Sequence, residues 1–196
     1  MNKEQQWETM IYRRIFPINT RIENNLVSDM EKALFQMCLE DQNKKAYLII
    51  DSGGGSVDSA LSGHDFIKSL PFPVECTVIG DCHSSSLTLM AACEKRKATK
   101  HSRFLFHAMS FNPNYKSTQD MQRQMEVRLR QHTILFDQVI NLQMKAYGIS
   151  KEELVEMRIA GDEYDVRLTA EEALKKGIIH EIVEKFDFFN PLVATH

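Results

Sequence analysis

The chain has 196 residues, of which 43% are hydrophobic and 26% charged, with a formal net charge of -3 and a sequence pI of about 6.2. This length suits one domain over residues 1–196, and the composition is that of a folded globular protein rather than a disordered one. The charge does not favour nucleic acid, and no apolar run is long enough to span a membrane. We expect a cytoplasmic protein, because the N-terminus lacks an apolar h-region and the four cysteines show no CxxC spacing.

Helical and strand patterns alternate in the first half of the chain. Apolar spacing predicts a helix over residues 24–40 and then a buried strand over 45–51, which leads into Ser52 and three glycines. Ser56 can cap the next helix, which Pro71 and Pro73 end. A second strand is predicted over 74–79, with Gly80 breaking it, and a further helix begins near Ser84.

The second half continues the alternation. We predict a third strand over 103–106 and a long helix over about 117–147, which Gly148 stops. Residues 150–153 and 169–172 have the form of capping boxes, and 178–183 is predicted to be a closing strand. The charged run 94–97 is interpreted as a solvated turn. The pattern therefore predicts an α/β fold with parallel strands, in which the long helix suits an interface between subunits.

Two side chains at predicted strand ends carry the candidate chemistry. Ser84 lies at a strand-to-helix turn, which exposes a hydroxyl at the positive end of a helix dipole. A serine there is also a common N-cap, so this pattern alone does not identify a nucleophile. His107 ends the third strand and suits a base near neutral pH. Both fall where open α/β sheets carry their sites.

The glycine run 53–55 ends another predicted strand. Glycines let backbone amides approach a reacting carbonyl and donate to its oxygen. A phosphate cradle is the alternative, but neither a P-loop sequence nor GxGxxG is present. The neighbours Cys82 and His83 have no further Cys/His cluster, so we predict no metal and no cofactor.

Five segments in order, covering about residues 12–185, resemble the Clp protease proteolytic subunit, the ClpP family. They are RRIFPINTRIENNLVSDMEKALFQM, YLIIDSGGGSV, IGDCHSSSLTLMAAC, RFLFHA and LTAEEALKKGIIHEIV. The resemblance implies a ClpP/crotonase-like spiral of β-β-α units with a long protruding handle helix. It also implies homo-oligomers, as heptameric rings stacked in pairs, and an AAA+ unfoldase ATPase as partner. The implied substrates are unfolded proteins or short peptides.

Carried over residue by residue, the resemblance implies a serine endopeptidase. The nucleophile falls on Ser84, the base on His107 and the acid on Asp165, with Asp162 in reserve. The oxyanion amides fall on Gly55 and Ser85. The implied reaction is acyl transfer to the serine followed by hydrolysis, with the aspartate orienting the imidazole.

The chain also departs from the family pattern. Gly53 replaces a proline and Asp51 an asparagine, Ser85 and Ser86 replace Met-Gly, and Cys82 and His83 replace small apolar residues. Residues 110–114 replace a glycine pair that binds extended substrate, and Pro113 there cannot donate a ladder hydrogen bond. The stretch before Tyr12 is short, which indicates a divergent member.

Two alternatives stay open at the level of sequence. A crotonase-type CoA-thioester enzyme would use the glycine amides without needing Ser84 and His107 together. A non-catalytic ring subunit would carry a misaligned triad. Acylation of Ser84 separates an enzyme from a scaffold, and the substrate separates the two enzymes.

Overall fold

The computed structural model describes residues 2–107, 118–159 and 165–186. Its helices are α1 (Lys3–Arg13), α2 (Asn24–Glu40), α3 (Val57–Ser69), α4 (Ser86–Ala92), α5 (Thr118–Tyr147), α6 (Lys151–Ile159) and α7 (Ala170–Lys175). Its strands are β1 (Ile15–Ile18), β2 (Ala46–Ser52), β3 (Val74–His83), β4 (Lys95–Thr99), β5 (Arg103–His107), β6 (Asp165–Thr169) and β7 (Glu181–Val183).

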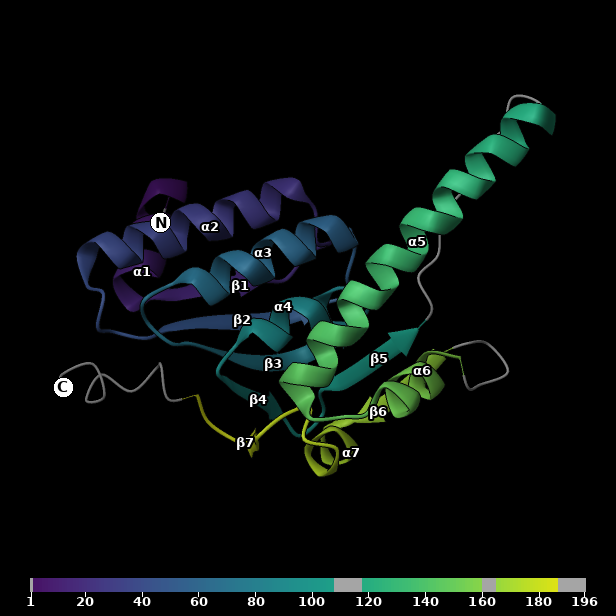
Figure 1. Cartoon of the computed structure of the whole chain (residues 1–196). Coiled ribbons are helices and arrows are strands. Elements are labelled where there is room, and N and C mark those ends of the chain that lie inside the picture. Colours follow the sequence, from purple (N-terminus) through teal and green to yellow (C-terminus); the bar gives the residue numbers. More distant parts are fainter. Residues whose placement is uncertain (1, 108–117, 160–164, 187–196) are drawn as a thin grey trace.

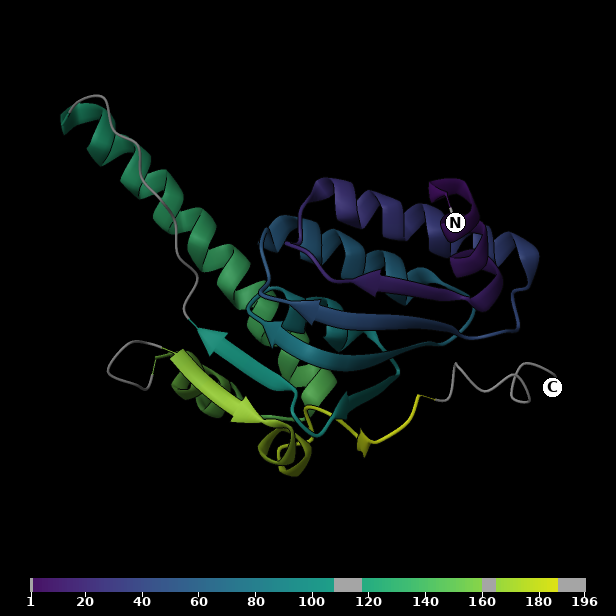
Figure 2. The ribbon, with the colours of Figure 1, turned by 180° about the vertical axis from the view of Figure 1, so that it is seen from behind.

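These strands of the described chain form one sheet in the order β1-β2-β3-β4-β7, from which β5 branches by pairing with β3, and β6 pairs with β5. All pairs are parallel except β5–β6, which is antiparallel. Helices α2 and α3 cover one face of β1–β3, while α5 projects away from the body (Figures 1 and 2). The predicted α/β fold is confirmed.

The buried face of α2 and the caps of α3 and α7 follow from their sequences. Helix α2 buries Val27, Met30, Leu34 and Met37 on one face, as the predicted spacing requires. The Ser56 hydroxyl accepts the Ser59 N–H and caps α3. Thr169 and Glu172 form the predicted capping box at α7, so local side-chain chemistry accounts for these boundaries.

We predicted that Gly80 ends the second strand, and this is wrong because β3 continues to His83. A Cβ atom at Gly80 would lie 2.3 Å from Asp51 Oδ1, so the Asp51 carboxylate occupies the space of a side chain. The Asp81 N–H donates to the same oxygen at 2.9 Å. The glycine therefore allows a close approach between β2 and β3, with no break in the strand.

The interpretation of residues 94–97 as a solvated turn is wrong. Strand β4 begins at Lys95, and Arg96 and Lys97 are only 5% and 7% exposed. Arg96 donates through its guanidinium to the carbonyls of Ile178 at 2.7 Å and Ala146 at 2.9 Å. Lys97 Nζ lies 3.4 Å from the Glu75 carboxylate. These hydrogen bonds and ion pairs offset the free-energy cost of burying the two cations.

The segment before β1 is the helix α1, which sequence periodicity did not predict. Asn2 and Gln5 form a capping box at its start. At its end Arg14 takes a left-handed conformation with φ of 56°, and its guanidinium donates to the carbonyls of Met37, Lys44 and Lys45. This side chain satisfies carbonyls at the end of α2 and before β2.

Among the helices of the described residues, none combines the length and the apolar composition that a membrane span requires.

Candidate active site

Ser84 occupies a strained turn between β3 and α4. Its φ is 55°, in the left-handed region that side chains other than glycine rarely adopt. The Ser84 N–H donates to the Leu105 carbonyl at 2.9 Å, and its own carbonyl accepts the Leu87 N–H at 3.1 Å. The backbone on both sides of Ser84 is therefore held, and its half-buried side chain is presented at the end of the strand.

His107 and Asp165 are direct partners in the antiparallel pair of β5 and β6. Residues directly opposite in such a pair share one sheet face, with Cβ atoms about 4.5–5.5 Å apart. The register thus brings together the backbone positions of the predicted base and acid, although 58 positions separate them in sequence. The reserve acid, Asp162, and the substrate-strand residues 110–114 lie outside the described residues.

The glycine loop packs directly against the serine turn. Gly54 has φ of 88°, and a Cβ atom there would lie 2.8 Å from Ser84 Cβ and 3.1 Å from Ser85 N. The Gly54 N–H donates to Ser52 Oγ at 3.2 Å. Within the described chain, the N–H groups of Gly55 and Ser85 donate to no protein acceptor. Two backbone donors therefore remain available next to the nucleophile candidate.

Ser85 and Ser86 differ in how their hydroxyls are satisfied. Ser86 Oγ contacts two carbonyl oxygens, that of His83 at 2.6 Å and that of Ser52 at 3.1 Å. The Ser86 hydroxyl thus links the serine turn to β2 and has the hydrogen-bond partner that a buried hydroxyl requires. Ser85 Oγ is buried and makes no hydrogen bond among the described residues.

Sequence reasoning missed an ionic cluster beside Ser84. Asp81 Oδ1 binds Arg103 Nε at 2.8 Å and lies 3.5 Å from His83 Nε2. Burial lowers the pKa of His83, and nearby Arg103, Arg167 and His107 lower it further, against the opposing effect of Asp81. The period-two spacing of 81 and 83 would have indicated a shared face only if β3 had been extended past Gly80.

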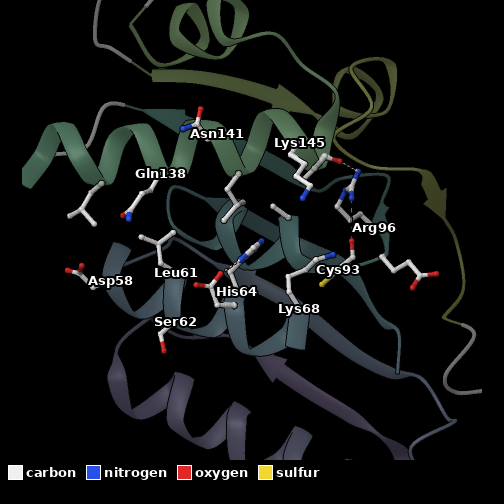
Figure 3. Close-up of a pocket in the computed structure, with 16 residues that line it drawn as sticks. Asp58, Leu61, Ser62, His64, Lys68, Cys93, Arg96, Gln138, Asn141 and Lys145 are labelled. Carbon is white, nitrogen blue, oxygen red and sulfur yellow. Dashed lines mark hydrogen bonds and ion pairs between the residues drawn. The ribbon is translucent and has the colours of Figure 1, made fainter. Parts of the chain in front are cut away.

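A large groove of about 950 Å³ lies elsewhere, between α3 and α5 (Figure 3). His64, Lys68 and Lys145 are among its lining residues, and His64 Nδ1 lies 2.9 Å from Asp65 Oδ1. Neither Ser84 nor His107 lines it. The groove therefore does not coincide with the predicted chemistry, and we assign the candidate site to the serine turn.

Comparison with known proteins identifies the family of this chain. The Clp protease family model matches residues 2–186. The chain is 30% identical over 92% of its length to an ATP-dependent Clp protease proteolytic subunit 1 of Chlamydia pneumoniae, covering 91% of that protein. A protein of the same name from Protochlamydia amoebophila is 28% identical over 89% of this chain and 82% of its own.

A solved structure of a ClpP mutant from Listeria monocytogenes shares the fold, with a TM-score of 0.81, 23% identity, and coverage of 94% of this chain and 99% of that one. These relatives support a peptidase function and do not favour a CoA-thioester enzyme. The match over nearly the whole length of the sequence shows that this chain belongs to the Clp protease family.

Proposed function

We propose that the chain is a serine endopeptidase that cleaves peptide bonds through an acyl-enzyme on Ser84. One observation carries the proposal: the left-handed Ser84 turn packs on Gly54, beside the strand that pairs His107 with Asp165. Acyl transfer needs a nucleophile, a base and an acid that orients the base, and Ser84, His107 and Asp165 are the residues proposed for these three roles.

Each residue has a distinct task in this reaction. His107 accepts the Ser84 hydroxyl proton as Oγ attacks the peptide carbonyl, and then gives that proton to the leaving amine. Asp165 orients the His107 ring and stabilises the imidazolium. The N–H groups of Gly55 and Ser85 donate to the oxyanion, which is supported by their unused hydrogen-bonding capacity within the described chain. Water then hydrolyses the acyl-enzyme.

Family membership supports a ring assembly for the peptidase. We propose homo-oligomeric heptameric rings stacked in pairs in the cytoplasm, with unfolded proteins or short peptides as substrates. A Clp-type AAA+ ATPase is the proposed partner, consistent with the names of the relatives. The long α5 helix supports a handle role between rings, because it projects from the body (Figure 1).

Fluorophosphonate labelling followed by intact mass measurement tests the nucleophile. We expect one adduct on the wild-type protein and none on Ser84→Ala. Ser62→Ala is the matched control, because Ser62 is an exposed serine on α3, and it should label like the wild type. A protein that takes no adduct in its assembled form, or an adduct that survives in Ser84→Ala, would refute the assignment and favour a non-catalytic subunit.

Asp165→Asn tests the acid. We expect the acylation rate to fall by roughly 10³- to 10⁴-fold while the assembly keeps its size, because the imidazole loses its orienting carboxylate. Labelling reactions stopped at successive times give the acylation rate, and light scattering gives the size of the assembly. An unchanged acylation rate would remove Asp165 from the triad and make Asp162 the candidate acid.

A further inference from the structure

One face of the sheet around Ser84 carries a charged row that the proposed mechanism does not use. Asp81 pairs with Arg103, and His83 with Leu105, in the parallel register of β3 and β5. Leu105 in turn pairs with Arg167 on β6. Since alternate strand residues share a face, His83 lies on the same face as His107, which is two residues beyond its partner Leu105.

The surroundings of His83 hold its ring in place. Its Nε2 lies 3.5 Å from Asp81 Oδ1, and Arg103 Nε binds the same oxygen at 2.8 Å. Asp51 Oδ1 accepts the Asp81 N–H at 2.9 Å, which fixes the backbone that carries this carboxylate. The His83 side chain is 23% exposed, so water screens it only in part.

The charged groups that act on His83 are Asp81 on its own strand, Arg103 and His107 on β5, and Arg167 on β6. Asp51 on β2 accepts the Asp81 N–H and so lies behind that carboxylate. Burial and the three basic neighbours all lower the pKa of His83, whereas Asp81 alone raises it. The ring is therefore neutral at pH 7 and gains a proton only at lower pH.

We propose that His83 is a positioning residue that acts through His107, permitting proton uptake by the base when its own ring is neutral and opposing it when its ring is charged. This rests on the proposed function. In acylation the Ser84 Oγ–C bond forms, the hydroxyl proton moves to His107, and the same proton leaves on the amine as the C–N bond breaks. A neighbouring imidazolium opposes the step that makes His107 cationic.

The size of this effect follows from the geometry of the sheet. Neighbouring strands lie about 4.8 Å apart and two residues advance about 6.6 Å along a strand, so diagonal neighbours on one face lie about 8 Å apart. Two unit charges at such a separation, in a partly screened site, change an equilibrium by roughly 3- to 30-fold. The acylation rate should therefore fall more steeply with decreasing pH than the protonation of a single base would allow.

The ratio of the acylation rate at pH 8 to the rate at a pH just below the titration midpoint of His83 measures that steepness. We expect the ratio to be roughly 3- to 30-fold smaller in His83→Gln than in the wild type, because glutamine stays neutral. His101→Gln, an exposed histidine in the turn before β5, should keep the wild-type ratio. Equal ratios in His83→Gln and the wild type would overturn the proposal. If His83→Gln does not fold, His83→Asn replaces it in the same measurement.

Histidine titration followed by NMR provides a readout that needs no catalysis. We expect the midpoint of His83 to rise when His107 is replaced by Gln, because one of the charges that oppose its protonation disappears. An unmoved midpoint would show that the two rings are uncoupled and would overturn the inference. Failure to label Ser84 at any pH would instead refute the peptidase proposal, while the titration would still decide the coupling.

Discussion

Gly53 and Gly54 are adjacent in the loop but meet different surroundings. A Cβ atom on Gly54 would lie 2.6 Å from the His83 carbonyl oxygen and 2.8 Å from Ser84 Cβ, and its φ is 88°. A Cβ atom on Gly53 would meet nothing within 4 Å. The two positions therefore form a matched pair in which only one change touches the nucleophile.

We predict that Gly54→Ala lowers the rate of Ser84 acylation by at least roughly 100-fold, because the methyl group displaces the serine turn and a displacement of about 1 Å can cost that much. Gly53→Ala should stay within about threefold of the wild type, because its methyl group meets open space. The measurement is the labelling rate at one pH, with circular dichroism to check folding. Equal rates in the two folded variants would contradict the close packing of Gly54 on Ser84.

The positions of Ser84 just after β3 and of His107 at the end of β5 could be predicted from the apolar patterns of these strands, whereas the catalytic roles of both residues stay predictions. The ionic cluster around Asp81 could not be predicted, because Gly80 looks like a strand end and its real role depends on a side chain 29 positions earlier. Local spacing carries no information on such a contact. The pairing of His107 with Asp165 likewise depends on an antiparallel register that only the folded chain defines.

At the scale of elements, β4 shows why a charged run can be misread. Arg96 is satisfied by carbonyls at the ends of α4, α5 and α7, all distant in sequence from one another. The backbone N–H of Arg96 donates to His180 Nδ1 at 3.0 Å, and the backbone N–H of His180 donates to the Arg96 carbonyl at 2.8 Å. Arg96 thus joins β4 to the segment before β7, and the hydrophobic pattern could not reveal it.

This junction makes the free energy of unfolding depend on pH. His180 Nδ1 can accept the Arg96 N–H only while it is unprotonated, and burial, then Arg96 and Lys95, lower the pKa of His180. The unfolded chain therefore binds more protons below about pH 6.5, so the contribution of His180 to stability is present above that pH and is lost as the pH falls through the folded pKa.

We predict that the melting temperature falls between pH 8 and pH 5 and that it falls less in His180→Asn, whose amide oxygen can accept a hydrogen bond at any pH. His83 contributes with the same sign, so part of the dependence should survive in the variant. Thermal denaturation at several pH values is the measurement, with His101→Asn as the exposed control. A pH dependence as steep in His180→Asn as in the wild type would argue against the junction.

At the scale of the whole molecule, α5 carries apolar side chains that the single chain does not cover. Met125, Val127, Leu129 and Ile134 are exposed, and Leu129 is 61% accessible. Met125 and Leu129 are four residues apart and so lie on one side of the helix. The helix projects from the body in both views, which leaves this side able to reach a second copy (Figures 1 and 2).

If α5 joins stacked rings, a charge at Leu129 should separate them. Burying a leucine stabilises an interface by about 1.5–3 kcal/mol, and in a symmetric assembly each copy would lose this contribution at once. We predict that Leu129→Asp yields a particle of half the wild-type mass by light scattering. Gln131→Asp introduces the same charge at an exposed position two residues on, facing another side of the helix, and should leave the mass unchanged. Equal masses for wild type and Leu129→Asp would mean that this side of α5 lies outside the ring-to-ring interface, and a loss of mass in both variants would indicate a general effect of charge on α5.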